Sequence, residues 1–241
     1  MTLSFRSITA PLALALVAAC SSSGTKLSMS ARSGTATAAA AAPGRTTRLA
    51  AGGGVNLTRV RMVIEEIKLE SAADGGSGGS SDGGSDGGVQ GEDTILGPYL
   101  LDMSGAALDS GLTQVFDADA VPGTYKEIRF KIHKLSGGDP QFPDMEGLSI
   151  RLEGTDSSGK AFIWTSSLDE EQRHEGTFVI ADGSSNNITL AIDTSGWFVD
   201  GNGRPIDPTA AQNGSLQSTV ESNIKNSIDA FDDDNHDGRH D

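Results

Sequence analysis

Alternating apolar and polar residues run through the middle of the chain. In residues 125–134, Ile128, Phe130 and Ile132 share one face and charged side chains share the other. A period of two residues is typical of a β-strand with one buried and one solvated side. The same alternation recurs in four shorter runs separated by turn residues, at 148–152, 162–164, 178–180 and 188–192.

An earlier run, residues 60–69, alternates in the same way but changes phase at Glu65-Glu66. A single extra residue of this kind predicts a β-bulge. No helical period separates these strands. We therefore expect a mainly β fold, a single antiparallel β-sandwich-like domain over residues 55–231.

The period changes near the C-terminus. Apolar residues then recur at helical spacing, at Leu216, Val220, Ile224, Ile228 and Phe231. This spacing predicts one C-terminal α-helix over about residues 215–231, packed against the sheet.

The N-terminus has the features of a targeting signal. Arg6 precedes the apolar run 10–19, which is shorter than the roughly 20 residues a membrane-spanning helix needs. The run ends in Val17-Ala18-Ala19-Cys20 and serines follow, which resembles the lipobox of bacterial lipoproteins. We expect a lipoprotein signal peptide at 1–19 and lipidation of Cys20. An ordinary secretory signal beside an unused thiol is the alternative.

Lipidation would hold the domain at a membrane, because each buried methylene contributes about 0.8 kcal/mol. Ser21 directly after the cysteine resembles the sorting signal for the outer membrane. The expected location is therefore the bacterial envelope, at the outer membrane, with the domain outside the cytoplasm.

Two segments have the composition of flexible chain. Residues 20–54 are rich in Ala, Ser, Thr and Gly and contain no acid, so we predict a disordered tether that starts at the lipidated cysteine. Residues 71–93 are rich in Gly, Ser and Asp and predict a disordered insert in the domain.

Charge and cysteine content exclude several function classes. Asp and Glu number 33 against 18 Lys and Arg, a formal net charge of -15. Such a chain repels phosphate backbones, so we expect no nucleic-acid partner. One cysteine rules out a disulfide framework and any zinc site built on cysteines.

The last ten residues, 232–241, carry the clearest candidate chemistry. Asp233, Asn235, Asp237 and Gly238 match positions one, three, five and six of a calcium loop. Arg239 would offer its backbone carbonyl at position seven, and Asp241 would stand at position nine. The spacing resembles the aspartate-rich repeats of thrombospondin type 3 and dockerin modules.

The match to an EF-hand is incomplete, because no glutamate stands at position twelve. Fewer ligands imply weak Ca2+ binding, with a Kd of about 0.1 to 1 mM. The alternative is a solvated acidic tail without a metal.

Other polar and aromatic residues give weaker signals. His133 and His174 lie in charged stretches and are expected on the surface. Neither Glu65-Glu66 nor Asp144 with Glu146 suggests a shared catalytic cleft. Trp164, Trp197 and Phe198 could stack on a sugar, although strand aromatics more often pack in the core.

Three segments resemble the bacterial lipoproteins grouped as domain of unknown function 4382. They are residues 60–69, the segment Gly97-Pro98-Tyr99-Leu100-Leu101-Asp102, and residues 121–129 with their Pro-Gly-x-Tyr. The resemblance implies an extracytoplasmic β-sandwich-like domain over most of residues 55–200. It implies no activity and no catalytic residue, and the glycine-rich insert departs from the family pattern.

These observations predict a lipid-anchored extracytoplasmic domain with a non-enzymatic binding or structural role and a weak C-terminal calcium site. Its partners would be the membrane, through Cys20, and an unidentified cell-surface protein or glycan. Two alternatives remain open, a carbohydrate-active or other hydrolytic lipoprotein and a glycan-binding module. Two carboxylates roughly 5 to 9.5 Å apart beside an exposed tryptophan would favour the hydrolase.

Overall fold

A computed structural model of the chain describes residues 24–34, 49–72, 92–109, 111–137 and 139–240. It is mainly β, with two sheets and one α-helix, as the sequence predicts. The strands are β1 (Lys26–Ser33), β2 (Leu49–Ala50), β3 (Asn56–Ser71), β4 (Glu92–Ser104), β5 (Thr113–Asp119), β6 (Gly123–Ile132), β7 (Ile150–Thr155), β8 (Ala161–Ser166), β9 (Glu170–Ile180), β10 (Ser185–Ile192) and β11 (Ile228–Asp232).

The helix is α1 (Gly214–Lys225), and four short 3-10 turns accompany it. These are η1 (Gly105–Asp109), η2 (Pro143–Met145), η3 (Thr194–Gly196) and η4 (Ala210–Gln212).

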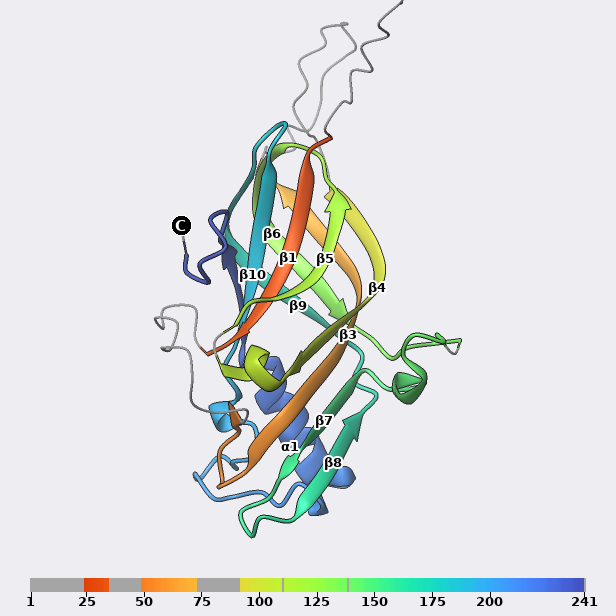
Figure 1. Ribbon diagram of the computed structural model, residues 1–241, viewed down its shortest axis with the longest axis vertical. Helices are drawn as coiled ribbons and strands as arrows, with labels where there is room; N and C mark the ends of the chain where they lie inside the picture. The colour runs from red at the N-terminus through yellow and green to blue at the C-terminus, as the bar shows by residue number, and fades with distance from the viewer. Residues whose placement is uncertain (1–23, 35–48, 73–91, 110, 138, 241) are drawn as a thin grey trace, which may run out of the picture.

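The long strand β3 lies at the centre of the larger sheet (Figure 1). That sheet has the order β8-β7-β3-β6-β9, and β2 and β4 also pair with β3. The half of β3 from Ile64 to Ser71 pairs with β6, and the half from Asn56 to Met62 pairs with β7. The predicted bulge is present, since the β3 register shifts between Ile64 and Glu66.

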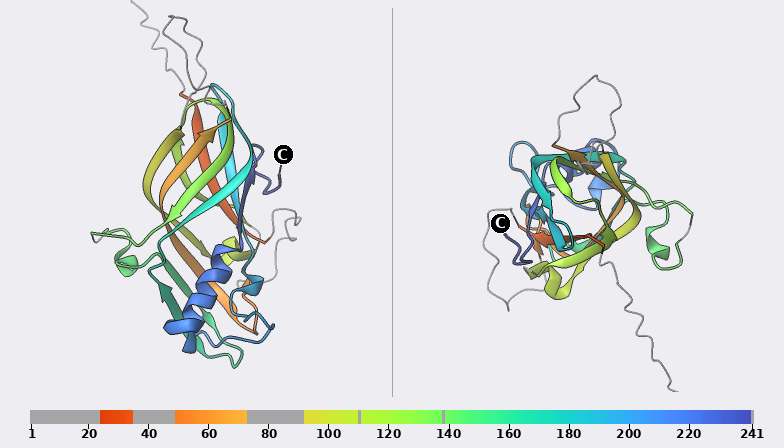
Figure 2. Two further views of the ribbon diagram at one scale, coloured as in Figure 1. Left: turned by 180° about the vertical axis from the view of Figure 1, so that it is seen from behind. Right: turned by 90° about the horizontal axis from the view of Figure 1, so that it is seen from above.

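The smaller sheet has the order β11-β10-β1-β5. Seen along the long axis, the two sheets curve around a common interior (Figure 2). β4 lies against β5, and β9 lies against β11, at the two edges where the sheets meet. One hydrophobic core fills the interior, with Phe130, Trp164 and Trp197 among its fully buried side chains.

Part of the predicted tether is in fact a core strand, which corrects the sequence prediction. Residues 26–33 form β1, which pairs in parallel with β10 and antiparallel with β5. Leu27, Met29 and Ala31 alternate into the core and are fully buried. Composition misled the prediction, because the strand is short and its partner β10 lies far along the chain. Cys20 and residues 35–48 lie outside the described residues.

The smaller sheet also departs from a purely antiparallel arrangement, since β1 and β10 run in the same direction. The predicted insert is shorter than expected at both ends: β3 continues to Ser71 and β4 begins at Glu92. Residues 73–91 lie outside the described part of the chain.

The predicted C-terminal helix is too long. α1 ends at Lys225, and Ile228 and Phe231 belong to strand β11, which pairs with β10. Ser227, just after the helix, is held by tertiary hydrogen bonds instead of helical ones. Its carbonyl accepts the Asp193 N–H, and its hydroxyl accepts a hydrogen bond from Trp197 Nε1 at 2.7 Å. Tertiary pairing with an open strand edge thus overrides the local helical period.

Candidate functional site

The aspartate-rich segment after β11 is folded into a compact loop over residues 233–240. Asp233 is fully buried at the start of this C-terminal loop. Its Oδ1 accepts the Asp237 N–H at 2.9 Å, and its Oδ2 accepts the Gly238 N–H at 3.0 Å. Oδ2 also accepts the hydroxyl of Thr189 on β10, at 2.7 Å. Asp233 therefore fixes the loop to the sheet.

The next two predicted ligands are exposed but accept hydrogen bonds within the same loop. Asn235 Oδ1 accepts the Asp237 N–H at 2.9 Å, and Asp237 Oδ1 accepts the Arg239 N–H at 2.9 Å. Gly238 has a φ of 76°, and a Cβ there would approach Arg32 Cδ to 3.1 Å. Glycine at position six is thus required by both the turn and the packing.

The structure brings the ligands only partly together. Positions one, three and five are linked through backbone N–H groups, whereas Asp241 lies outside the described residues. Within the described part of the chain, no group of three or more His, Cys, Asp or Glu side chains is close enough to hold a metal ion. Asn235 and the Arg239 carbonyl would have to complete the shell.

A buried arginine lies under the C-terminal loop. Arg32, on β1, is 2% exposed, and its guanidinium carbon is 5.9 Å from the centre of the Phe231 ring. Burial lowers the pKa of Arg32, while the charges of Asp233 and Asp237 favour its protonated form. The buried carboxylate of Asp233 therefore has an internal cation near it.

Sequence reasoning missed Arg32 because it lies in the predicted tether. The signal was present in the alternation of Leu27, Met29 and Ala31, which assigns Arg32 to the opposite face of a strand. The acidic neighbours of Arg32, Asp233 and Asp237, lie about 200 residues further along the chain, and no local pattern identifies them.

A polar network continues from the loop into the smaller sheet. Asn187 Oδ1 accepts the hydroxyls of Ser28 and Ser30 at 2.9 and 3.1 Å. Its Nδ2 donates to Thr189 Oγ1 at 3.0 Å and to the Asp233 carbonyl at 3.2 Å. β1, β10 and the C-terminal loop are therefore linked by one set of buried hydrogen bonds.

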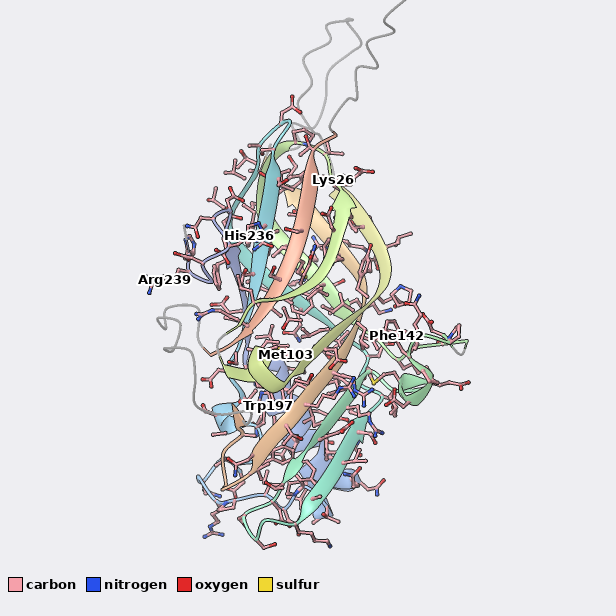
Figure 3. The ribbon with its side chains drawn as sticks, viewed as in Figure 1. Lys26, Met103, Phe142, Trp197, His236 and Arg239 are labelled. Carbon is pink, nitrogen blue, oxygen red and sulfur yellow. The ribbon has the colours of Figure 1, made fainter. Side chains whose placement is uncertain are left out.

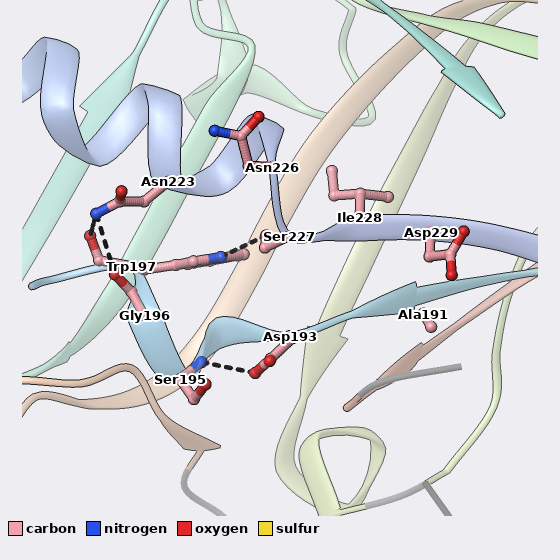
Figure 4. Close-up of a pocket in the computed structure, with 10 residues that line it drawn as sticks. All are labelled: Ala191, Asp193, Ser195, Gly196, Trp197, Asn223, Asn226, Ser227, Ile228 and Asp229. Carbon is pink, nitrogen blue, oxygen red and sulfur yellow. Dashed lines mark hydrogen bonds between the residues drawn. The ribbon is translucent and has the colours of Figure 1, made fainter. Parts of the chain in front are cut away.

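A cavity of about 490 Å³ lies between η3 and the C-terminal end of α1 (Figure 4). Its polar groups serve the fold. Asp193 accepts the Ser195 N–H at 3.0 Å, and Asn223 Nδ2 donates to three backbone carbonyls. Ser227 accepts from Trp197 and donates to the Ile224 carbonyl at 2.7 Å, so its hydroxyl is not poised as a nucleophile.

Three of the carboxylates singled out from the sequence lie in ion pairs with cations. Glu65 lies 3.2 Å from Lys131 Nζ, and Glu66 lies 3.1 Å from Lys68 Nζ. Asp144 lies 2.6 Å from the buried Arg61, and this hydrogen bond lowers the pKa of Asp144. These ion pairs occupy Glu65, Glu66 and Asp144.

The prediction that His174 is a surface residue is wrong. Its side chain is 10% exposed and stacks on Phe130 with ring centroids 5.4 Å apart. Burial lowers the pKa of His174, and Asp229, whose Oδ1 is 3.5 Å from Nδ1, partly opposes the shift. His133 is partly exposed and lies 3.1 Å from Asp169.

The aromatic residues considered for sugar stacking are in the core. Trp164, Trp197 and Phe198 are all fully buried. Trp164 Nε1 donates to the Ala211 carbonyl at 2.7 Å. None of the three can form an exposed platform, which removes the observation that would have favoured the hydrolase or the glycan-binding module.

In comparisons with family models, curated proteins and solved structures, nothing matches this chain. The resemblance to domain of unknown function 4382 therefore stays a prediction. In the described part of the chain, no helix is both long enough and apolar enough to span a bilayer.

Proposed function

We propose that this chain is a lipid-anchored extracytoplasmic domain with a non-enzymatic binding or structural role, whose C-terminal loop binds Ca2+ weakly. The anchor is Cys20, and the outer membrane is the proposed location. The partner is a cell-surface protein or glycan. The observation that carries the calcium proposal is the hydrogen bonding of Asp233 to the backbone of positions five and six.

These hydrogen bonds support the proposal by ordering the loop before a cation arrives. Each of the side chains at positions one, three and five accepts at least one N–H from within the loop. The side chains at these positions carry carboxylate and amide oxygens, the ligand type that calcium prefers.

Arg32 keeps the expected affinity low. It already compensates part of the charge of Asp233, so the electrostatic gain from a second cation is smaller than in an all-acidic site. The proposed Kd remains about 0.1 to 1 mM, which suits an extracellular concentration of calcium.

A non-enzymatic role is supported by the polar groups of the 490 Å³ cavity, which are engaged in structural hydrogen bonds. The conspicuous carboxylates are likewise engaged in ion pairs. In the described residues, no particular arrangement favours hydrolysis.

Thermal unfolding of the full chain with Cys20→Ser, in EDTA and across a calcium series, tests the calcium proposal. A ligand that binds the folded state stabilises it by RT ln(1 + [L]/Kd), about 2.7 kcal/mol for 10 mM calcium on a 0.1 mM site. We expect Asp237→Ala to abolish the shift.

Asp117→Ala is the matched control, because Asp117 is an exposed acid on β5 far along the chain from the loop. It removes the same charge and should leave the calcium shift intact. Equal shifts in both variants would reduce the effect to general screening, and the absence of any shift in the parent chain would make the loop a metal-free structural cap.

A further inference from the structure

The chain enters the fold very close to the predicted lipidation site. β1 begins at Lys26, which pairs with Ser185 on β10 and with Asp119 on β5. Just before it, Thr25 Oγ1 donates to Asp182 at 3.1 Å. The start of the described chain is therefore fixed between the β9–β10 and β5–β6 turns.

The same end of the molecule gathers several other chain turns. Ala72, directly after β3, donates its N–H to the Thr124 carbonyl, and Asp93 accepts the Val121 N–H at 3.1 Å. We call residues 24–26, 71–72, 92–93, 119–124 and 181–185 the anchor end. Lys26 lies at this end, whereas Trp197 lies toward the opposite one (Figure 3).

The opposite, distal end is defined by the start of β3. There the β7–β8 turn meets the turn before β3, since a Cβ on Gly54 would lie 2.9 Å from Ser157 Cβ. α1 also lies in that half of the molecule (Figure 1), and η4 contacts both α1 and β8. β3 has 16 residues and, at about 3.3 Å per residue, separates the two ends by about 50 Å.

Covalent reach distinguishes the two ends. Six peptide steps join Cys20 to Lys26, and a fully extended chain covers about 20 Å in that number of steps. A 35-residue flexible tether would have allowed any face of the domain to approach the bilayer, but the presence of β1 removes that freedom. An anchor on Cys20 leaves the distal end out of reach of the headgroups.

We propose that the anchor end faces the lipid headgroups and that the distal end, with α1 and the β7–β8 turn, projects away from the membrane. This orientation rests on the proposed lipidation of Cys20. It makes the distal end the face available to a partner on the cell surface.

The charge of the anchor end opposes its insertion into a membrane, so only the covalent anchor on Cys20 holds it near the headgroups. Its acids are Glu92, Asp93, Asp119 and Asp182, with Asp117 close by on β5, and Lys26 is paired with Asp119 at 2.7 Å. Such a surface is repelled by anionic headgroups. Val121 and Val179, 43% and 47% exposed, offer too little apolar area for insertion.

Energy transfer from a single labelled site to a dye on the lipid headgroups tests the orientation. Cys20 is the one cysteine of the chain, so a cysteine added to the lipidated protein is a unique thiol. Ser185→Cys labels the anchor end, and Ser157→Cys labels the distal end. Both positions are exposed serines and form a matched pair.

In vesicles of phosphatidylcholine and phosphatidylglycerol, we expect transfer from position 185 to exceed transfer from position 157 several-fold. A long Gly/Ser insertion between Ser23 and Gly24 should erase most of that difference. Equal transfer from the two sites in protein that floats with the vesicles and carries acyl chains by mass would overturn the orientation alone. Protein that neither floats nor carries acyl chains would overturn the anchoring and the orientation together.

Discussion

At the scale of single residues, His174 lies where β9 of the larger sheet meets β11 of the smaller one. Its ring is stacked on Phe130 and almost closed off from water. Its ordinary pKa is 6.5, and burial lowers it in the folded state. The unfolded chain therefore binds a proton at a higher pH than the folded chain does.

The sign of the resulting pH dependence follows directly. Folding stability from neutral His174 is complete above pH 6.5 and is lost as the pH falls toward the lowered pKa, by at most about 1.4 kcal/mol per pH unit. His174→Phe keeps an aromatic ring against Phe130 and removes the proton. The free energy of unfolding, measured in urea, should fall between pH 7 and pH 5 in the parent chain and should fall less in the variant. If the free energy of unfolding depends on pH equally in both proteins, another group causes the loss of stability.

At the scale of elements, the strands with strict alternation were predictable and those with remote partners were not. The β3 bulge at Glu65 and the β6 strand followed from local pattern alone. β1 and β11 did not, because each is defined by pairing with β10. A tether-like composition and a helix-like period are both overridden by the gain from completing a sheet edge.

The same limit applies to the candidate site. The calcium-loop register was readable from Asp233 to Gly238, and those side chains do order one loop. Arg32 was not readable as its neighbour, because no sequence pattern connects β1 with the C-terminus. The more common fate of strand aromatics, packing in the core, is confirmed for Trp164, although periodicity alone does not reveal whether such a residue faces the core or the solvent.

The assignment of residues 26–33 to a strand can be checked with one backbone change. Ser28 lies inside β1, in regular register with both β10 and β5, so Ser28→Pro removes a ladder hydrogen bond from an interior strand. We expect a loss of about 3 kcal/mol or more in the free energy of unfolding. Ala38→Pro, in the remainder of the predicted tether, is the control and should change little. If both proline variants change the free energy of unfolding equally and only slightly, residues 26–33 are not a strand and belong to the tether.

At the scale of the whole molecule, the first described strand, β1, meets the C-terminal loop. Arg32 near the N-terminus lies beneath the loop that begins at Asp233, and both are almost fully buried. A buried charge that loses its partner is costly, so the two ends should be energetically coupled although the strands between them form separate sheets.

A double-mutant cycle measures that coupling. Arg32→Met and Asp233→Asn should each lower the free energy of unfolding in EDTA by about 1 to 3 kcal/mol, because each removes one of two buried groups whose opposite charges attract each other. The double variant should lose less than the sum, with a coupling energy of about 0.5 to 3 kcal/mol.

Lys26 and Asp119 give the comparison pair, since they join β1 to β5 at 2.7 Å with side chains 47% and 82% exposed. An exposed pair of this kind is worth about 0 to 1 kcal/mol. If the effects at Arg32 and Asp233 are strictly additive, the charge of Arg32 does not stabilise the contact between β1 and the C-terminal loop. The loop is then held by its hydrogen bonds to Thr189 and Asn187.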